Sequence, residues 1–557
     1  MRKRKKCFIS LLLCASIAFA LCGCGASQLS FFVNDKDIKE FDTSLFYGNV
    51  ETMRGADPSL IWVESREGDP DSGYYYAYVT ASSTINAWRT NDMTNWQYLG
   101  AVFRPNLDEH WASTNFWAPA VIYDEDEGTY YMYYSASWNK YSYATHFVSL
   151  AKSDSPMGPF EEVGGSDAPL VNFANIPEDN PLYEYHPKES TYDSGYFSAI
   201  DAEPFVDPAD GSKYLLFTHD KGAGYSASST YIMKMKDWET PDYSSVTCIS
   251  QAGYVTVGGS ETIDEGTVNE GPYMSYHDGY YYLTFSVHTY TESSYQVRQA
   301  VGTSPMGPFR KISTDKGGTV ITTDGLGIYT NSSGHHSLIL VGDELFISYH
   351  TFLNDSDIAE SRKIRFDRVG YVINEDGIPV LYASGPTVTL QPLPGQMSGY
   401  ENKAPDAQIT ATNLTDGSDL YWLNDGTLKI HDDSVVDETY FKEGKSRITL
   451  VWEDYVPAKA ILVYNSCNYD SSFTGIDNIK IWYRKDNRTG VYKTGKLNFN
   501  YDIYGNEDYN AIYAGTPIAI EFDDLNIEKV EITLSESLGG EKMGISEITV
   551  LGKEESK

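Results

Sequence analysis

The sequence predicts an all-β protein in which a five-bladed β-propeller is followed by a β-sandwich of the jelly-roll type. Three observations support this prediction: a fivefold repeat, an abundance of tyrosine, and a C-terminal segment of short strands that lacks the repeat. Similar turn motifs recur at roughly 60 to 85 residues, a period typical of a radial array of blades. The motifs are Ala56-Asp57-Pro58, Trp117-Ala118-Pro119, Asp201-Ala202-Glu203-Pro204, Glu270-Gly271-Pro272 and His335-His336-Ser337.

The propeller is predicted to span residues 46–395. Each motif leads into an aromatic-rich run that is expected to be a strand, because aromatic side chains pack well on a pleated sheet. Residues 155–160 and 304–309 share the run Ser-Pro-Met-Gly-Pro-Phe, whose proline and glycine fix a tight connection between strands. We expect these two turns to be structural.

A second domain is predicted over residues 400–553, beyond the boundary at Pro392-Leu393-Pro394-Gly395. Its short strands continue without the blade motif, which is most simply a sandwich. The segment Leu423-Asn424-Asp425-Gly426 and the closing run of residues 545–550 resemble the galactose-binding-like (discoidin-type) jelly roll. Such modules either bind sugar or support a catalytic domain, and both roles are open here.

Residues 1–24 are predicted to be a lipoprotein signal peptide. A basic segment precedes an apolar run of residues 7–21, which is too short for a permanent membrane span. The run ends in Leu21-Cys22-Gly23-Cys24, which resembles a bacterial lipobox whose last cysteine receives lipid. Residues 25–45 would then be a tether, and the protein an extracellular, cell-surface lipoprotein of a bacterium, held to the membrane by lipid on Cys24. An ordinary signal peptide is the alternative.

Charge and cysteine content limit the partners. The formal net charge of −36 argues against nucleic acid, whose phosphates would be repelled, and fits a neutral ligand. Four of the six cysteines lie in the leader, which leaves Cys248 and Cys467 far apart in the sequence. The mature chain is therefore expected to have neither a disulfide framework nor a cysteine cluster for zinc.

Three of the five motifs carry an acid: Asp57, Asp201 and Glu270. Equivalent positions in successive blades converge on the propeller axis, so these carboxyl groups are expected to meet at the centre of one face. Glycosidic hydrolysis needs one group to protonate the leaving oxygen and another to act at the anomeric carbon, and two carboxyl groups supply both. A third carboxylate beside the acid can raise its pKa by like-charge repulsion.

The three acidic motifs resemble, in order, those of glycoside hydrolase family 43, whose members are five-bladed propellers. The matching segments are residues 54–59, residues 200–207 followed by 210–214, and residues 269–273. The resemblance covers the propeller and implies inversion of configuration, with Asp57 as general base, Glu270 as general acid and Asp201 as pKa modulator. Glu203 and Asp207 crowd Asp201, so the modulator is assigned by motif alignment; Asp207 is expected to cap a turn.

His336 begins the fifth blade and is predicted to face the axis. The resembled family, particularly its arabinan-active members, places a histidine here beside a calcium ion or water cluster in the central channel. His336 is therefore a candidate metal contact through water, with Ca²⁺ as the candidate cofactor. The sequence contains no carboxylate cage like that of a dedicated calcium loop, so water would supply most ligands. A buried histidine satisfied by the backbone is the alternative.

Four side chains are candidates for contacts with sugar: Trp88, Phe116, Trp117 and Arg298. The three aromatic residues lie near strand starts in the first two blades, where they could stack on a pentose. Core packing is the alternative for Phe116, and a surface ion pair is the alternative for Arg298. The motif Trp117-Ala118-Pro119 resembles one that is frequent among arabinan-active members of the family.

These features predict an exported, inverting glycosidase that cleaves α-L-arabinofuranosyl linkages in plant cell-wall polysaccharide such as arabinan or arabinoxylan. A β-xylosidase of the same family is the first alternative. A non-catalytic surface lipoprotein that binds carbohydrate is the alternative from another class. A propeller used only for binding would have no reason to keep both the base and the acid, so the enzyme is favoured.

Overall fold

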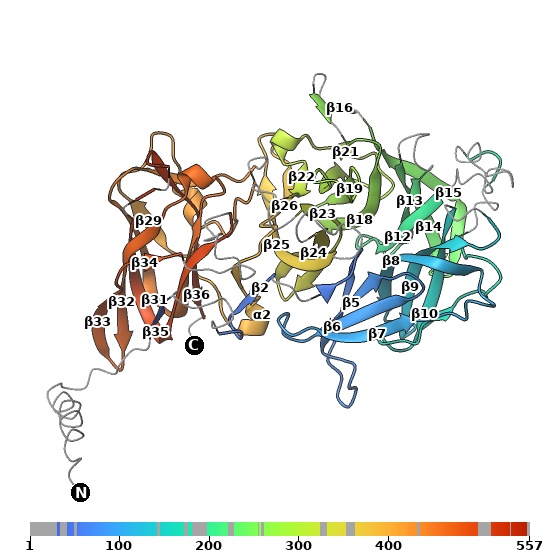
Figure 1. The fold of residues 1–557 in the computed structure, drawn as a ribbon, viewed down its shortest axis with the longest axis horizontal. Coiled ribbons are helices and arrows are strands. Elements are labelled where there is room, and N and C mark those ends of the chain that lie inside the picture. The colour runs from blue at the N-terminus through green and yellow to red at the C-terminus, as the bar shows by residue number, and fades with distance from the viewer. Residues whose placement is uncertain are drawn as a thin grey trace, which may run out of the picture.

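The computed structural model describes residues 31–33, 42–49, 53–141, 145–171, 177–180, 198–220, 228–253, 255–257, 261–263, 265–323, 331–352, 362–431, 435–499, 514–534, 536–537 and 539–553. The architecture is all-β, with a five-bladed propeller beside a strand-rich C-terminal module (Figure 1). The leader and the lipidation predicted at Cys24 lie outside the described residues. Within the described part, no helix is long and apolar enough to cross a membrane.

Each blade is built on four antiparallel strands. Blade 1 comprises β4 (Ser59–Val63), β5 (Tyr74–Thr80), β6 (Ile85–Thr90) and β7 (Gln97–Phe103); blade 2 comprises β8 (Ala112–Asp124), β9 (Thr129–Trp138), β10 (His146–Ser153) and β11 (Glu161–Glu162). Blade 3 comprises β12 (Ser198–Val206), β13 (Lys213–Asp220), β14 (Ser229–Asp237) and β15 (Thr240–Gln251); blade 4 comprises β18 (Asn269–His277), β19 (Tyr280–Val287), β20 (Gln296–Gly302) and β21 (Arg310–Lys311). Blade 5 comprises β23 (Asn331–Val341), β24 (Glu344–Phe352), β25 (Lys363–Ile373) and β26 (Pro379–Ala383).

Shorter elements complete the propeller. β22 (Thr319–Ile321) joins blade 4 beside β20, and β16 (Val255–Val257) pairs with β17 (Glu261–Ile263) in a hairpin. β3 (Met53–Arg54) pairs with β25 of the last blade. The segment that precedes blade 1 therefore closes the ring on blade 5, which brings the first motif next to the fifth.

The aromatic-rich runs form the second strand of every blade, as the repeat predicted. Their side chains supply the cores between blades: Tyr76, Tyr78, Tyr133 and Tyr282 are each fully buried. Each of these phenols still has a hydrogen-bond acceptor, for example the carbonyl of Pro156 for Tyr78, so the polar end is not left unsatisfied.

The C-terminal module is a β-sandwich with its own apolar core. Its strands are β28 (Glu401–Asn402), β29 (Gln408–Ala411), β30 (Thr439–Lys442), β31 (Ser446–Asn465), β32 (Gly475–Lys485), β33 (Arg488–Lys493), β34 (Leu497–Asn498), β35 (Pro517–Leu534) and β36 (Lys542–Gly552). The long strands β31 and β35 pair at both ends, with a register shift between Val451 and Val456. Among the described residues, the short helical turns are η4 (Thr314–Lys316) in the propeller, α2 (Gly395–Ser398) after it, and η5 (Tyr421–Leu423) and η6 (Tyr469–Ser471) in the module.

Of the predicted tether, residues 25–45, the structure describes residues 31–33 and 42–45, and these contact the C-terminal module or the propeller; the tether as a whole stays a prediction. β1 (Phe31–Val33) adds to the edge of the C-terminal module beside β35. Lys459 donates to Asp42 at 3.1 Å, and Leu45 is 1% exposed. The backbone pairing of Phe31–Val33 and the buried side chain of Leu45 account for these contacts.

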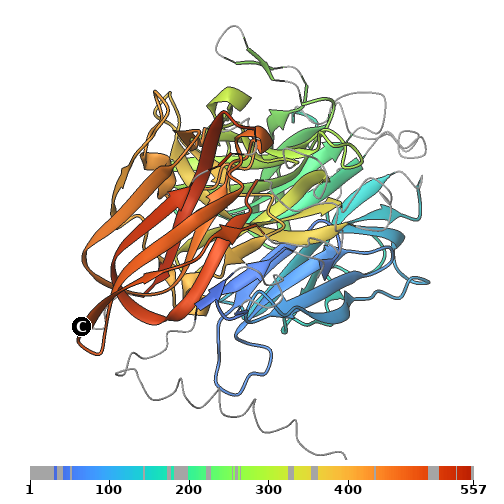
Figure 2. The same cartoon turned by 60° about the vertical axis from the view of Figure 1, so that its left-hand side comes forward.

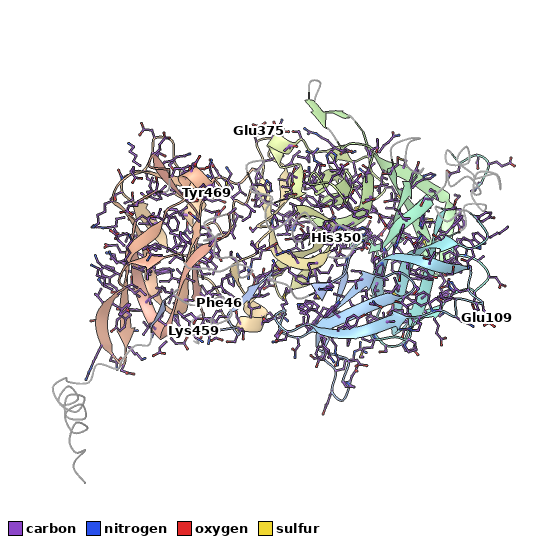
Figure 3. The ribbon with its side chains drawn as sticks, viewed as in Figure 1. Phe46, Glu109, His350, Glu375, Lys459 and Tyr469 are labelled. Carbon is purple, nitrogen blue, oxygen red and sulfur yellow. The ribbon has the colours of Figure 1, made fainter. Side chains whose placement is uncertain are left out.

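The propeller and the module pack against each other beside blade 5, as Figures 1 and 2 both show. β2 (Phe46–Gly48) pairs with β27 (Leu390–Pro392), and Phe46 lies between the two domains (Figure 3). The Tyr382 hydroxyl, from β26, donates to the Leu428 carbonyl of the module at 2.8 Å. The module therefore supports the propeller at the blade that lies next to the first motif.

Candidate active site

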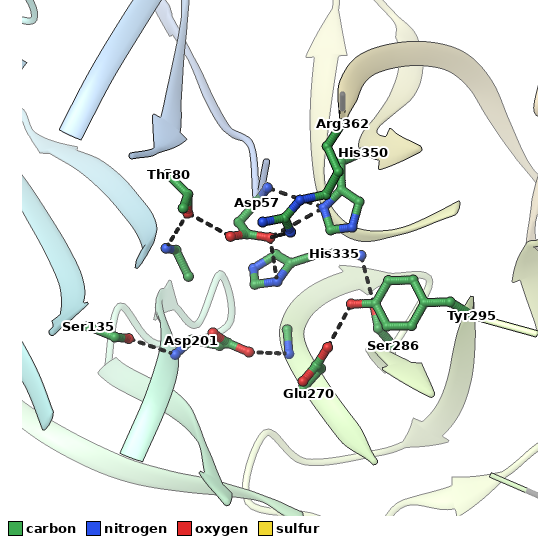
Figure 4. A network of polar contacts seen from close by, with 12 residues as sticks. Asp57, Thr80, Ser135, Asp201, Glu270, Ser286, Tyr295, His335, His350 and Arg362 are labelled. Atoms are coloured by element: carbon green, nitrogen blue, oxygen red, sulfur yellow. Dashed lines mark hydrogen bonds and ion pairs between the residues drawn. The ribbon is translucent and has the colours of Figure 1, made fainter. Parts of the chain in front are cut away.

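One residue per blade adopts a left-handed backbone conformation at an equivalent place, on or just before the first strand. These residues, with their φ angles, are Asp57 (54°), Ala118 (44°), Asp201 (57°), Gly271 (54°) and His335 (46°). In blades 2 to 5 the strand pairing shifts register at this residue. A bulge takes a side chain out of the regular alternation, and Asp57, Asp201 and His335 converge in Figure 4. We call these five residues the axial ring.

Hydrogen bonds join the axial ring from blade to blade. In four cases the backbone N–H donates to a side chain that follows the aromatic-rich run of the preceding blade. The bonds run from Asp57 to His350 Nδ1 (3.3 Å), from Ala118 to Thr80 Oγ1 (2.8 Å), from Asp201 to Ser135 Oγ (3.0 Å) and from His335 to Ser286 Oγ (2.8 Å). Each blade is thereby fixed to its neighbour at the axis.

The fifth connection differs, and it involves two of the acids. The N–H of Gly271 donates to Oδ2 of Asp201 at 3.0 Å. Thr218 holds the position in blade 3 that Ser286 holds in blade 4, since it pairs with Ile200 as Ser286 pairs with Glu270. The Thr218 hydroxyl, however, has no hydrogen-bond partner among the described residues. The Asp201 carboxylate thus takes the place of a strand hydroxyl and fixes the backbone next to Glu270.

Asp57 is 7% exposed, and polar side chains surround its carboxylate. Thr80 donates to its Oδ2 at 2.6 Å, and Arg362 donates to its Oδ1 at 3.3 Å. The Nδ1 atoms of His335 and His350 lie 3.3 and 3.2 Å from the same Oδ1. This arrangement is drawn in Figure 4 and holds the carboxylate in one orientation.

The electrostatics favour an ionised Asp57. Burial alone would raise its pKa, but the neighbouring His335, Arg362 and His350 groups hold that pKa well below its ordinary value. Burial lowers the pKa of His335 and brings that of His350 to about 4, so both rings are neutral near neutral pH. Arg362 therefore supplies the permanent positive charge among the three.

Glu270 is the residue directly before Gly271, the axial-ring residue of blade 4. The Tyr295 hydroxyl donates to its Oε1 at 2.8 Å. The His335 ring packs against Gly271, where a Cβ would lie 3.2 Å from the ring carbon Cγ. The imidazole ring thus lies between Asp57 and the backbone at Gly271, the residue after Glu270.

The family follows from comparison with known proteins. The model of glycosyl hydrolases family 43 matches residues 50–379, more than half of the chain. The chain is a member of glycosyl hydrolase family 43. It is therefore a glycoside hydrolase, which confirms the family that the acidic motifs predicted.

Individual family 43 relatives are distant. A β-D-galactofuranosidase of Aspergillus niger is 28% identical over 314 residues, which are 53% of this chain and 76% of the relative. A probable arabinan endo-1,5-α-L-arabinosidase of Emericella nidulans is 26% identical over 336 residues, covering 55% of this chain and 77% of the relative. A crystal structure of a thermostable family-43 glycoside hydrolase is 27% identical, covers 62% of this chain and 99% of that chain, and has a TM-score of 0.49.

Trp117 and Phe116, both predicted to contact sugar, have different surroundings in this family 43 enzyme. Trp117 precedes the axial ring in blade 2, as Glu270 does in blade 4, and stacks on His146 with ring centroids 4.4 Å apart. Phe116 is fully buried against Phe103 and Tyr134. The structure contradicts the prediction for Phe116, because its ring belongs to the core and presents no face to a ligand.

Trp88 and Arg298 both donate hydrogen bonds to other parts of the propeller. The Trp88 indole donates to the carbonyl of Arg54 at 3.2 Å. Arg298 is 6% exposed and donates to Thr314, and Glu265 is a close charged neighbour. Arg298 is therefore buried and does not lie at the surface, as the alternative for it had assumed. Sugar contacts by Trp88 and Arg298 stay predictions.

His336 is 4% exposed, and its Nε2 lies 2.6 Å from Thr284 Oγ1. Burial lowers its pKa to about 3, so the ring is neutral, and Nδ1 has no hydrogen-bond partner among the described residues. Tyr273 lies 5.9 Å from the His336 ring, and burial followed by the charge of Glu203 raises the pKa of Tyr273. Burial also raises the pKa of Glu203 well above its ordinary value.

These donors bear on the predicted calcium ion. Within the part of the chain that the structure describes, no three His, Cys, Asp or Glu side chains are grouped to hold a metal. Calcium takes roughly six to eight oxygen ligands, so the residues present fit only an ion held mainly by water, next to His336. Ca²⁺ in the central channel stays a prediction. Asp207 accepts from the backbone N–H of Ala209 at 2.9 Å, as expected for a turn cap.

Sequence reasoning missed the side chains that hold the acids in place. Thr80, Ser135, Ser286 and His350 each follow an aromatic-rich run, and this shared position was a signal that the repeat contained. Arg362 and Tyr295 had no such signal. Arg362 also lies over the exposed ring of Tyr290, with its guanidinium carbon 4.8 Å from the ring centroid, which links that ring to Asp57.

Proposed function

We propose that this glycoside hydrolase is an inverting enzyme that cleaves α-L-arabinofuranosyl linkages in plant cell-wall polysaccharide. The observation that carries the proposal is the convergence of Asp57, Asp201 and Glu270, whose carboxyl groups accept hydrogen bonds from Thr80, the Gly271 N–H and Tyr295, respectively. In this assignment Asp57 is the general base, Glu270 is the general acid and Asp201 modulates the acid.

The surroundings of Asp57 suit a base that activates water. Its pKa is held well below the ordinary value, so the carboxylate is ionised near neutral pH. Thr80, His335 and Arg362 fix its orientation, and a fixed acceptor removes a proton from water in one direction.

The position of the His335 ring supports inversion. An inverting glycosidase needs room for a water molecule between the carboxylate and the sugar, whereas a retaining one brings the two carboxyl groups closer. The His335 ring contacts Asp57 on one side and Gly271, the neighbour of Glu270, on the other. Inversion stays part of the proposal until the product configuration is measured.

The names of relatives support an arabinose-containing glycan. Two are probable arabinan endo-1,5-α-L-arabinosidases and a third is a β-D-galactofuranosidase. A β-xylosidase is the alternative within the family. Product analysis on linear arabinan, debranched arabinan, arabinoxylan and the two nitrophenyl pentosides separates the candidates, and product from the β-xyloside alone would overturn the arabinosyl assignment.

The test of the catalytic assignment uses Asp57→Asn and Glu270→Gln. Each removes one of two indispensable groups, so turnover should fall by about 100- to 10,000-fold for each. Proton NMR of the first product formed by the wild type should show inverted configuration. Near wild-type turnover in either variant would exclude that residue, and retained configuration would exclude the inverting mechanism. The rival of a purely binding lipoprotein predicts no turnover at all.

We also propose that the enzyme acts outside the cell as a lipoprotein anchored through Cys24. The basic and apolar leader that ends in Leu21-Cys22-Gly23-Cys24 supports this location. Two acyl chains on one cysteine are enough for stable anchoring. Cys24→Ala should therefore move activity from the membrane fraction to the medium or leave the leader uncleaved. Mature variant that stays in the membrane fraction as the wild type does would exclude the anchor.

A further inference from the structure

Tyr295 contacts the proposed acid, Glu270, and also His350, which contacts the proposed base. It lies directly before β20, and its side chain is fully buried. Its hydroxyl donates to Glu270 Oε1 at 2.8 Å. Its ring lies parallel to that of His350, with an interplanar angle of 11° and centroids 5.7 Å apart, and His350 in turn contacts Asp57. A single side chain therefore orients the acid and lies against a neighbour of the base.

The fold makes a specific space for this ring. Gly334 is the residue before the axial ring in blade 5, where blade 2 has Trp117 and blade 4 has Glu270. A Cβ on Gly334 would lie 2.2 Å from Cε1 of Tyr295, a distance that no side chain tolerates. The backbone of Tyr295 is fixed as well, since its N–H donates to the Glu292 carbonyl at 3.1 Å.

Tyr295 stays a hydrogen-bond donor at every working pH. Burial, followed by the charges of Glu270 and Asp57, raises its pKa well above the ordinary value. A hydrogen bond donated to a carboxylate favours its ionised form. As Glu270 gives its proton to the leaving oxygen, the carboxylate that forms is stabilised by this bond.

We propose that Tyr295 is a positioning residue for Glu270, whose hydroxyl fixes the orientation of the carboxyl group and stabilises the carboxylate produced by proton transfer. The proposal rests on the assignment of Glu270 as the acid. Asp201 acts in the opposite sense, because its like charge disfavours ionisation of Glu270. The other groups near this side of the site are His335, against Gly271, and Asp57 with Arg362 beyond it.

The variant that tests the proposal is Tyr295→Phe, which keeps the ring and removes the hydroxyl. Tyr281→Phe is a matched control, because it also removes a 2.8 Å hydrogen bond from a buried tyrosine to a carboxylate. Here the acceptor is Asp207, which lies in a turn of blade 3 away from the axial ring. Tyr295→Phe should lower kcat on an arabino-oligosaccharide about 10- to 100-fold and change KM little. Tyr281→Phe should leave both constants unchanged.

Two further readouts separate positioning of the acid from a general structural effect. Without the hydroxyl, Glu270 becomes a weaker acid, so the alkaline limb of the pH–kcat profile should move upward, by about one pH unit. The loss in kcat should be small for a nitrophenyl glycoside, whose leaving group needs little protonation. Asp201→Asn should move the alkaline limb in the opposite direction, towards lower pH.

Gly334→Ala provides a second route to the same result. Its Cβ displaces the Tyr295 ring while the hydroxyl is kept, so the alkaline limb should again move upward. Equal losses on both leaving groups, or an unchanged alkaline limb in Tyr295→Phe, would overturn the proposal. Glu270→Gln is measured in the same assay: wild-type turnover there removes the acid assignment itself, whereas a large loss there with an unchanged Tyr295→Phe rejects only the role of Tyr295.

Discussion

Blades 2 and 4 share a backbone plan, but only blade 4 carries a proposed catalytic acid. Both have a proline after the axial-ring residue, Ala118 in one and Gly271 in the other, with φ angles of 44° and 54°. Both contain the turn Ser-Pro-Met-Gly-Pro-Phe. They differ in the side chain that precedes the ring, which is Trp117 in blade 2 and Glu270 in blade 4. The axial ring is therefore a property of the fold, and the chemistry depends on which side chains stand on and beside it.

The largest expected effect comes from substituting the residue directly before the axial ring in each of the two blades. Glu270→Gln removes the acid and should lower kcat on an unactivated oligosaccharide by about 100- to 10,000-fold. Trp117→Phe keeps an aromatic ring stacked on His146 and should change kcat/KM by less than about tenfold. Steady-state kinetics on one substrate compare them. Equal losses of kcat in Glu270→Gln and Trp117→Phe would contradict the view that Glu270 takes part in the chemical step and Trp117 does not.

The sequence predicted the propeller and the convergence of Asp57, Asp201 and Glu270 because a repeat places equivalent residues at one axis. For Phe116, the neighbour of Trp117, it left core packing and contact with sugar open. At the bulge in β8 the regular alternation is interrupted, so Phe116 enters the core while its neighbour Trp117 stands directly before the axial-ring residue Ala118. A pattern of period two gives no account of such a point.

Other parts of the site had no repeat to reveal them. Arg362 and Tyr295 reach the acids from segments before the third strand of a blade, and nothing at these positions recurs in the other blades. The folded part of the predicted tether was missed for a related reason. Phe31–Val33 is a three-residue strand whose partner, β35, lies almost 500 residues further along the chain, and local composition does not encode such a pairing.

The second prediction exchanges the ring residues themselves. Gly271→Ala puts a Cβ 3.2 Å from His335 at a φ of 54°, which strains the backbone and pushes the imidazole away from Asp57. We expect a loss of about 1–2 kcal/mol in the free energy of unfolding, together with a fall in kcat of about tenfold or more. Ala118→Gly relieves the same strain in blade 2 and should leave kcat unchanged. Thermal denaturation and kinetics of both variants test this; a harmless Gly271→Ala would contradict it.

The third prediction concerns the acid limb of the pH profile. Arg362 helps to hold the pKa of Asp57 below its ordinary value, so Arg362→Gln should raise that pKa and move the acid limb to higher pH. The depressed pKa of Asp57 also makes the stability of the fold depend on pH. A carboxyl with a depressed pKa stabilises the fold above about pH 4, and this contribution is lost as pH falls through the folded-state pKa.

Arg89 is the matched control for Arg362. Its guanidinium lies 3.2 Å from Asp71 and 4.4 Å from the Tyr74 ring, as that of Arg362 lies by Asp57 and Tyr290, but no proposed catalytic group is involved. Arg89→Gln should leave the pH–activity profile unchanged. Profiles of kcat between about pH 3 and 9 compare the two variants. An acid limb that stays in place in Arg362→Gln would show that the histidines alone set the pKa of Asp57.

The smallest expected effect compares two tyrosines of blade 4 with nearly equal exposure. Tyr290 is 39% exposed and carries the Arg362 guanidinium over its ring, while Tyr276 is 40% exposed and packs on Tyr281, the tyrosine that bonds Asp207. A fixed, exposed ring next to the base can stack on a sugar, so Tyr290→Ala should raise KM about three- to tenfold, and kcat should stay within about twofold. Tyr276→Ala should change neither constant. A rise in KM shared by both variants would mean that surface aromatic area determines the affinity, rather than the position beside Arg362. A fall in kcat confined to Tyr290→Ala would instead show that this ring helps to hold Asp57 in place.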